Sequence, residues 1–360
     1  MRYFKYLILF FPALLIGQSE TGYYINWNND HTGQSIKPTI KISEEESRII
    51  NCYFVEFDEE ENFKSVKYFN SGKPSSNTNF GAHERIRKHT KHGYQYEFKN
   101  VSGVSTVNSN GIKYYSFKVD SNGHWIEKGN IDDDGNLVEE NGISLIKVTR
   151  DSHNRILTEI RYNIKNDTIP DVNDFRIVHL TYDHNNYTTS RQNRDEEGKL
   201  INAKYGYAKV VFQFDQNGMF YGEEFLNADK KLTSHPNFGF AKIDFRDFNK
   251  YGKNYREYYS DESGYPCSDI SMGKIIYNSN MSMQEISFFN RIGERSEDNR
   301  GFSKIRFVYD SNGNILKRMN YNVNDELSSK QYLTLYMFAY PPQAETTIYR
   351  YRQTVQILLC

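Results

Sequence analysis

The stretch from Asn130 to Asn141, "NIDDDGNLVEEN", has the residue types and spacing closest to a metal site in this sequence. Asn130, Asp132 and Asp134 occupy alternate positions before Gly135, as the oxygen ligands of a calcium-binding loop do. The twelfth position is Asn141 instead of a bidentate glutamate, and no helix is predicted on either side. A structural turn is therefore the first interpretation. Ca²⁺ at Asn130, Asp132 and Asp134 is the alternative, and no other cofactor is expected.

A second group of residues that could bind a ligand is the basic segment "HERIRKHTKH", residues 83–92, in which three histidines lie among four arginines and lysines. Nearby cations oppose the binding of a metal ion, and no cysteine or carboxylate pair completes a ligand set. On a β-strand, His83, Arg85 and Arg87 would share one face. The expectation is a solvated basic stripe, with an anion or polyanion site as the alternative.

Motifs of the common catalytic classes do not occur in the sequence. There is no Gly-x-Ser-x-Gly elbow, phosphate loop, His-Glu-x-x-His pair or dinucleotide fingerprint. Asp and Glu residues are expected at turns and on polar faces. This pattern favours a non-enzymatic protein, with a cryptic carboxylate pair as the enzymatic alternative.

The elements that carry these residues come from internal repetition. "FVYDSNGNILKRMNYNVNDEL" at 307–327 has a diverged copy, "FKVDSNGHWIEKGNIDDDGNL", at 117–137. Further copies give turn signals 29 to 34 residues apart, at Gly72, Gly103, Gly135, Asp167, Gly198, Lys230, Gly264, Gly293 and Asp325. Repetition at so even a spacing is typical of a repeat array.

Each unit carries another turn signal roughly 15 residues earlier, such as "VDSNG" at Asp120 or "YDSNG" at Asp310. Between the turns, residues alternate with a period of two, as Ile305 and Phe307 do with Lys304 and Arg306. The predicted fold is all-β: an array of about nine β-hairpin repeats of roughly 32 residues each. They are expected to form an extended or spiralling antiparallel sheet, with a closed barrel less favoured.

The polar faces of the strands are the predicted binding surface. Lys209, Gln213, Lys304 and Arg306 fall on the solvent side of this alternation, and the chain contains 29 tyrosines that could stack on sugars or peptides. The aromatics recur at a constant phase of the repeat, however. This favours packing against the next repeat over ligand binding.

The ends of the chain differ from the array, which is assigned to residues 51–331. Residues 1–19 have a basic start, an apolar run and small residues near Ser19, and are predicted to be a signal peptide. A lead-in segment is expected over 20–50 and a C-terminal cap over 332–360. The protein is therefore expected to be exported, to the periplasm, the cell surface or the medium, with no transmembrane segment after signal cleavage.

Composition narrows the possible partners. Lys plus Arg number 45 against 46 Asp plus Glu, so the net charge of −1 argues against a nucleic acid or an anionic membrane as partner. The 38% hydrophobic and 15% aromatic content fits a thin β-rich body. Three cysteines allow one disulfide at most. A Cys52–Cys267 bond would require the array to spiral or close, and Cys360 would remain.

"YDSNGNILKRMNY" resembles the tyrosine–aspartate repeats of bacterial RHS-type proteins, through Tyr309, Asp310, Gly313, Asn314 and Ile315. Phe214, Asp215 and Gly218 match the pattern in part, and the unit also resembles MORN-variant hairpin repeats. RHS repeats are nearer 20 residues long, and the large core domain of toxin-bearing members is not visible here. The resemblance implies a hairpin array that can coil into a spiral. It implies no toxin and no catalytic residue.

The function expected from these features is that of an exported, non-enzymatic scaffold that binds another protein or a cell-surface polymer through an extended sheet face. One alternative is a carbohydrate-binding or carbohydrate-active protein. The other is a β-shell fragment of a toxin or secretion-associated RHS-like protein.

Overall fold

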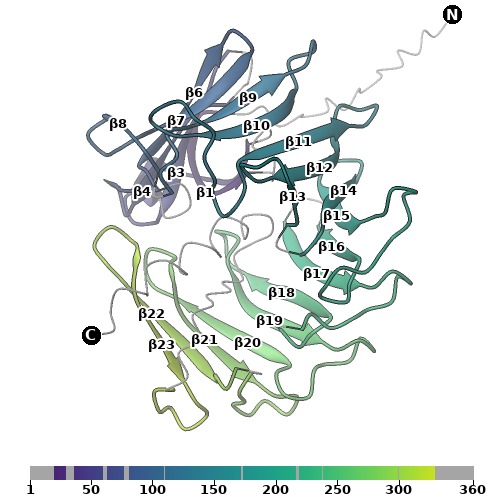
Figure 1. The fold of residues 1–360 in the computed structure, drawn as a ribbon. Helices are drawn as coiled ribbons and strands as arrows, with labels where there is room; N and C mark the ends of the chain where they lie inside the picture. Colours follow the sequence, from purple (N-terminus) through teal and green to yellow (C-terminus); the bar gives the residue numbers. More distant parts are fainter. Residues whose placement is uncertain are drawn as a thin grey trace, which may run out of the picture.

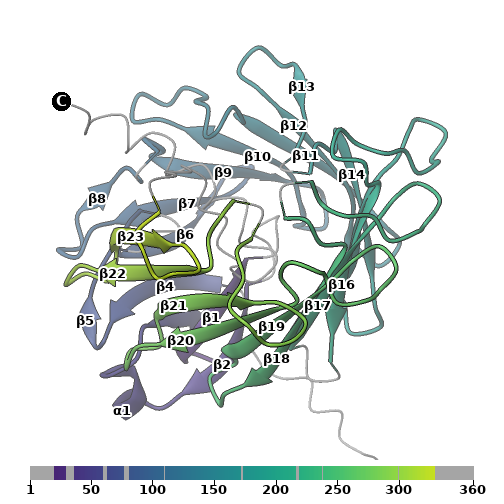
Figure 2. The same cartoon turned by 90° about the horizontal axis from the view of Figure 1, so that it is seen from below.

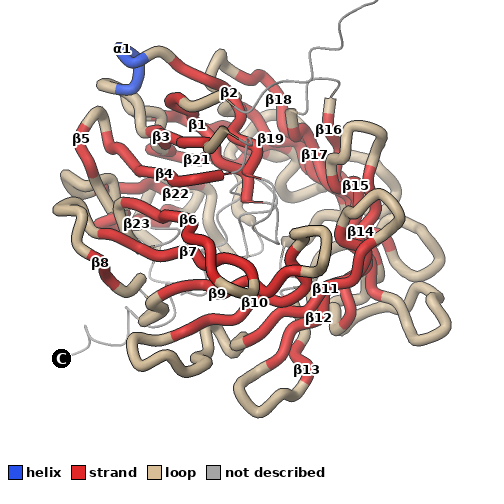
Figure 3. The backbone as a smooth tube through the Cα atoms, turned by 90° about the horizontal axis from the view of Figure 1, so that it is seen from above, coloured by secondary structure: helices blue, strands red, loops and turns tan. Residues whose placement is uncertain are grey.

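The computed structural model describes residues 20–29, 36–59, 63–76, 81–108, 110–171, 173–215, 219–236, 238–298 and 300–328. The signal peptide predicted at 1–19 and the cap predicted at 332–360 lie outside these ranges. The described chain folds into one antiparallel sheet of 23 strands with a single short helix, α1 (Glu44–Ser47) (Figure 3). No helix in these ranges has the length and apolar character needed to cross a membrane.

The strands follow one another with short connections. They are β1 (Gly22–Asn29), β2 (Ile36–Ile42), β3 (Cys52–Phe57), β4 (Phe63–Asn70), β5 (Lys73–Pro74), β6 (Glu84–Thr90), β7 (Gly93–Lys99), β8 (Ser105–Thr106), β9 (Tyr114–Val119), β10 (Trp125–Ile131), β11 (Leu145–Arg150), β12 (Ile156–Tyr162), β13 (Thr168–Ile169), β14 (Ile177–Tyr182), β15 (Thr188–Asn193), β16 (Lys209–Phe214), β17 (Phe220–Leu226), β18 (Lys242–Phe248), β19 (Asn254–Ser260), β20 (Met272–Tyr277), β21 (Met283–Phe289), β22 (Lys304–Tyr309) and β23 (Ile315–Tyr321).

Nine hairpins form the body of the sheet, which confirms the predicted array. They are β3–β4, β6–β7, β9–β10, β11–β12, β14–β15, β16–β17, β18–β19, β20–β21 and β22–β23, called hairpins 1 to 9 below. The lead-in segment adds the hairpin β1–β2 beside β3. Among the described strands, β2 pairs only with β1 and β23 only with β22, so the sheet is open at both ends.

The turns explain why Asp, Asn and Gly recur. In the first turn of hairpin 3, between its two strands, the Asp120 Oδ1 accepts hydrogen bonds from the backbone N–H groups of Asn122 (2.9 Å) and His124 (3.0 Å). Gly123 has a φ of 82°, a left-handed conformation that costs glycine little. The second turns of hairpins 2 to 9, each of which follows its hairpin, are built in the same way. The turn signal predicted at Asp167 is displaced by one residue, because the residue with positive φ in that turn is Asn166 (65°).

The linking segments carry a third turn of the same design, which the sequence pattern did not indicate. The Asp171 Oδ1 accepts from the backbone N–H of Phe175, and the Asp298 Oδ1 accepts from that of Phe302. Both phenylalanine side chains are completely buried. The linkers after hairpins 4 and 8 therefore fold back and insert an apolar side chain under the sheet.

The tyrosine of the Tyr-Asp motif joins neighbouring hairpins. The Tyr309 hydroxyl donates to the Met283 carbonyl oxygen (2.6 Å) in the preceding hairpin, and the Tyr182 hydroxyl donates to that of Ile156 (2.9 Å). Such bonds satisfy carbonyls near the starts of strands and hold successive units in register.

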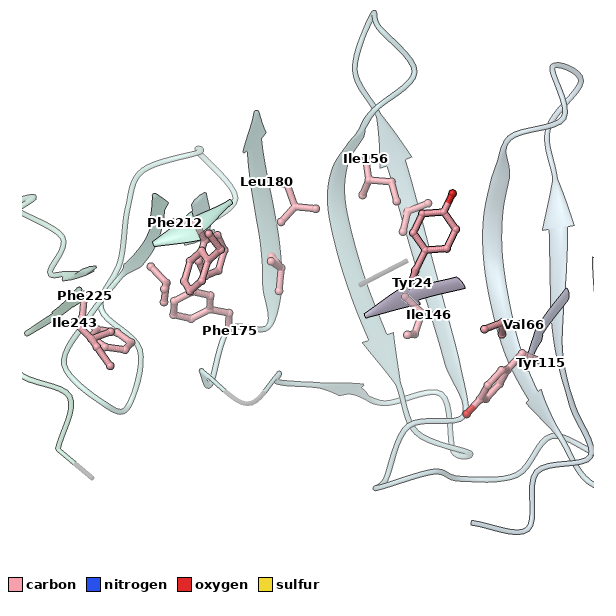
Figure 4. Packing of buried hydrophobic residues seen from close by; sticks show 14 of the residues in the cluster. Tyr24, Val66, Tyr115, Ile146, Ile156, Phe175, Leu180, Phe212, Phe225 and Ile243 are labelled. Atoms are coloured by element: carbon pink, nitrogen blue, oxygen red, sulfur yellow. The ribbon is translucent and has the colours of Figure 1, made fainter. Parts of the chain in front are cut away.

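A continuous apolar core lies along the inner face of the sheet (Figure 4). Alternate residues of the first strands, such as Val178 and Leu180, belong to this core together with aromatics of the second strands, such as Phe225 and Phe288. Of the aromatics that end the second strands, Phe98, Phe225 and Phe288 are at most 3% exposed, as packing between repeats predicts, whereas Tyr162 and Tyr321 are only partly buried. One hairpin cannot bury such a face alone, so each unit depends on its neighbours.

The sheet coils so that its late hairpins meet its first one. The Asn51 backbone N–H, just before β3, donates to the Asn280 carbonyl in the first turn of hairpin 8 (3.1 Å). The Asn70 side chain, at the end of β4, donates to the Ser311 carbonyl in hairpin 9 (2.9 Å). Contact between hairpins 1 and 8 means that one turn of the spiral takes about seven hairpins. Figures 1 and 2 show β18–β23 as a second tier beside β3 and β4.

This seam between the two tiers has its own small core. Tyr251 and Met281, from the first turns of hairpins 7 and 8, pack against the buried side chains of Ile25, Ile42, Ile50 and Cys52. The Lys250 ammonium also forms an ion pair with the Glu46 carboxylate of α1 (2.6 Å). Both apolar and polar contacts therefore stabilise the seam between the two tiers.

Candidate functional site

A row of ionisable residues crosses the inner face of the sheet, where apolar side chains are expected. Each lies seven residues before the positive-φ residue of the second turn: Lys128, Glu159, Arg191, Glu223, Glu257 and Arg318. Each stands directly opposite an apolar residue of the neighbouring strand, as Val148 does for Glu159 and Phe212 for Glu223. We call this set the inner ionisable row.

The middle of the row is a buried network of charges. The Arg161 guanidinium lies 2.6 Å from the Glu159 carboxylate and 3.7 Å from that of Asp171, and Arg191 lies 2.7 Å from Asp171. All four side chains are at most 3% exposed. Buried charges are tolerated only when they are paired, so this network is interpreted as structural.

Lys128 shows the same principle with an aromatic partner. Its ammonium lies 4.1 Å from the centre of the Tyr115 ring, whose hydroxyl donates to the Glu140 carboxylate (2.8 Å). Burial lowers the pKa of Lys128, and the nearby Glu140 charge opposes this change.

Glu223 and Glu257 differ from the other members of the inner ionisable row because they are two acidic residues that follow one another in it. Burial, with repulsion from Glu257 as the smaller cause, raises the pKa of Glu223 to about 7. Burial also raises the pKa of Glu257 to about 7, although hydrogen bonds from Tyr259 and Asn254 act in the opposite direction. The Tyr259 hydroxyl donates to the Glu257 Oε2 at 2.5 Å. Two acids that titrate near neutrality can exchange protons at physiological pH.

The repeat breaks next to this pair. The second-turn spacing changes from 32 residues to 34 and then to 29 around Gly264. In β20, Gly273 occupies the inner position that Ile146, Val178 and Ile305 hold elsewhere, and it stands opposite Glu257. A Cβ atom at Gly273 would lie only 2.9 Å from the Tyr259 hydroxyl. The glycine therefore makes room for the Glu257–Tyr259 pair.

Sequence reasoning missed this inner row, because it placed Asp and Glu at turns and on polar faces. The period of two along the strands did contain the information needed to find it. Glu223 and Phe225 lie two residues apart and so share a face, as do Glu257 and Tyr259.

The predicted outer-face residues are placed on one side of the sheet, as expected, but are not equally accessible. Arg306 is exposed and lies 2.6 Å from the Glu285 carboxylate, and Gln213 donates to Glu224 (2.8 Å). Lys209 is partly exposed. The expectation that Lys304 faces solvent is wrong: its side chain is 9% exposed and lies 2.5 Å from an oxygen of the Asp325 carboxylate. Binding by these residues remains a prediction.

The predicted calcium residues have other partners. The Asn130 side chain is buried and donates to the Ile143 carbonyl (2.7 Å), while the Asp132 Oδ1 accepts from the backbone N–H groups of Asp134 and Asn136. This is the second turn of hairpin 3 in its ordinary form. In the described ranges, no three His, Cys, Asp or Glu side chains gather as metal ligands. Calcium binding at Asn130, Asp132 and Asp134 therefore stays an untested expectation.

The expected basic surface stripe is corrected, because His83 and Arg85 are buried. Arg85 stacks on the Tyr96 ring, with its guanidinium carbon 4.8 Å from the ring centre, and Arg87 lies 4.1 Å from the centre of the Tyr94 ring. Aromatic faces attract a guanidinium group, so the strand turns these cations inward.

The possible disulfide is not formed. Cys52 and Cys267 are free thiols, and they belong to two separate apolar clusters. The chain does spiral, but its seam places Met281 and Tyr251, rather than Cys267, against the Cys52 cluster. Cys360 lies outside the described residues.

No family model matches this chain, and no curated protein matches its sequence. Among solved structures, the chain is similar to the TcdB2-TccC3-TEV crystal structure, with 10% identity and a TM-score of 0.29 over 76% of this chain and 14% of that one. It is also similar to the Tc holotoxin pore of Photorhabdus luminescens, with 10% identity and a TM-score of 0.28 over 76% of this chain and 13% of that one. A third is an alternansucrase in complex with isomaltononaose, with 13% identity and a TM-score of 0.13 over 68% and 16%. This chain thus spans less than a fifth of each, and at TM-scores below 0.5 these likenesses carry no argument about it.

Proposed function

We propose that this chain is an exported, RHS-like β-repeat scaffold that binds a protein or a cell-surface polymer through the outer face of its sheet. The observation that carries the proposal is a recurring pair on that face, in which a cation lies over an aromatic ring. The distances from the Lys147 and Lys274 ammonium groups and the Arg306 guanidinium carbon to the centres of the Tyr162, Phe289 and Tyr321 rings are 5.2, 4.7 and 5.9 Å.

The spacing of these pairs suits an extended partner. They sit at equivalent registers of hairpins 4, 8 and 9, and neighbouring strands in a sheet lie about 4.8 Å apart. Ring faces flanked by Lys or Arg can contact sugar rings or peptide side chains, and the polar neighbours Gln213 and Arg306 add hydrogen-bond donors. Most of the inner face is occupied by packed side chains, so the outer face is the broader surface available to a partner.

The test is a comparison of partners captured by the wild type and by an outer-face variant, together with binding to a glycan array. Lys209→Ala, Gln213→Ala and Arg306→Ala are combined, and Lys304 is left in place because its side chain is buried. The matched control carries Lys165→Ala and Lys231→Ala in exposed second turns. Loss of partners from the outer-face variant alone supports the proposal. Capture of the same partners by all three proteins contradicts it.

A carbohydrate-active role is the second candidate, favoured by Glu223 and Glu257. Glycoside hydrolysis commonly uses two carboxyl groups, one of them protonated near neutral pH. A turnover screen against polysaccharides tests this role, with Glu223→Gln and Glu257→Gln as the inactive controls. Turnover that both substitutions abolish would support it. No turnover, or turnover unchanged in both variants, would contradict it.

A further inference from the structure

One rim of the spiral is formed by the second turns and the residues that follow them. This second-turn rim comprises residues 100–107, 132–137, 163–167, 195–201, 227–232, 261–265, 290–294 and 322–327 in hairpins 2 to 9. In hairpin 1 the corresponding edge is covered, because the first turns of hairpins 8 and 9 dock there. The molecule itself thus shows what fits this rim: the first turns of another tier of hairpins.

Among the described residues, the rest of the second-turn rim is largely exposed, and seven of its eight turns carry at least one exposed large apolar side chain, among charged residues such as Asp133 and Glu197. Of the seventeen large apolar side chains that are exposed in the described ranges, ten lie on it. They are Val101, Val104, Val107, Leu137, Ile164, Ile201, Tyr265, Ile292, Val323 and Leu327, with Ile292 the most exposed at 78%. The concentration of exposed apolar side chains on one rim favours this rim as a surface that another molecule covers.

The complementary surface is also present and free. Asp310 to Gly313, "DSNG", docks at the seam: the Ser311 and Asn312 carbonyls accept hydrogen bonds from Asn70 and Ser75 (2.9 and 2.7 Å). The same four residues occur at Asp120 to Gly123, in the first turn of hairpin 3, where Ser121, Asn122 and Gly123 are exposed. This loop therefore has the docking sequence, and three of its four residues are exposed.

We propose that a second copy of this chain stacks on the second-turn rim, so that its first turns repeat across the interface the contacts of the internal seam. The open sheet agrees with this arrangement, because β23 and β2 are unpaired edges at opposite ends of the described sheet. The two surfaces in contact differ, so the interface is heterologous and copies can add one after another along the spiral axis. This inference is independent of the outer-face function.

The first test is sedimentation velocity of the mature chain from about 1 to about 100 µM. The wild type is expected to show concentration-dependent oligomers. Ile164→Asp and Ile292→Asp, which place a charge on exposed rim positions, are expected to weaken association by at least about tenfold. The control is Lys147→Asp, an exposed residue in the middle of β11, away from both the rim and the first turns. A wild type that stays monomeric over this range overturns the proposal, as does equal association of rim and control variants.

The second test determines which surfaces meet. Asn122→Cys and Ile292→Cys are introduced separately in a chain with Cys360→Ser, and the two proteins are mixed under oxidising conditions. A disulfide between the two variants supports first-turn loops docking on the rim. Disulfides only between two Ile292→Cys copies would show that the rims meet face to face, and would overturn the proposed arrangement. Absence of any intermolecular disulfide would overturn it as well.

Discussion

Replacing Glu257 by glutamine is expected to stabilise the protein at about pH 8 and to change its stability little at about pH 5. Glu257 is 1% exposed on the inner face, and burial raises the pKa of its carboxyl group from 4.5 to about 7. Below about pH 4.5 the group is neutral in both the folded and the unfolded chain, so it costs nothing. Above about pH 7 it is ionised in both, and only the folded chain bears the cost of a buried charge.

The magnitude follows from the change in pKa. A rise from 4.5 to about 7 corresponds to about 3 kcal/mol of lost folding stability, which develops between these two pH values. Glutamine is nearly isosteric, and its carbonyl oxygen can still accept the hydrogen bond from the Tyr259 hydroxyl. The substitution also removes the charge that repels Glu223, so the gain of a double Glu223→Gln, Glu257→Gln variant should be less than the sum of the two single gains.

The assay is urea unfolding of both proteins at several pH values between about 5 and 8.5, followed by the fluorescence of the buried Trp125. The expected gain in unfolding free energy is less than about 1 kcal/mol at pH 5 and about 3 kcal/mol at pH 8. Glu294→Gln, in the exposed second turn of hairpin 8, is the control and should change stability by less than about 0.5 kcal/mol throughout. A gain that does not depend on pH, or a loss at pH 8, would refute the reasoning.

Three further outcomes are expected. Arg191→Met should destabilise the protein by about 3 kcal/mol in urea unfolding, since it removes a partner of the fully buried Asp171 carboxylate; an effect under 1 kcal/mol would contradict the role of this network. Tyr251→Ala should cost about 2 kcal/mol by opening the seam, visible as a lower thermal midpoint, and an unchanged midpoint would count against a seam that stabilises the spiral. Burial raises the pKa of the Cys52 and Cys267 thiols to about 12 and about 11, so both should resist a thiol reagent until guanidinium unfolds the chain, whereas fast labelling of either in the folded protein would disagree.

Much of the fold was predictable because it rests on local chemistry. Asp120 and Gly123 form a turn through the side-chain acceptor of the one and the positive φ of the other, and both properties belong to the residue type. The period of two in strands such as 304–309 likewise follows from strand geometry alone. The turn signal at Asp167 was misplaced by one residue because Asn166 and Asp167 both suit a turn, and only the folded backbone decides which of them adopts positive φ.

The side chains of the candidate site were harder to place, because their environment comes from other strands. Lys304 alternates like an outer-face residue, yet Tyr321 and Asp325 from the following strand and turn cover it. Arg85 appears as a surface cation in the sequence, but the rings brought beside it, such as that of Tyr96, make an inward orientation favourable.

By itself, the sequence determined the unit of this protein. Turn residues at regular intervals, separated by strands in which apolar and polar residues alternate, build antiparallel hairpins. Each of these hairpins is stable only when it packs against its neighbours. The tertiary structure decided how that ribbon coils, which brings hairpin 8 against hairpin 1, and which charges become buried, as at Glu257. The reason is that turn and strand preferences act over a few residues, whereas curvature and burial depend on contacts between residues as far apart as Asn70 and Ser311.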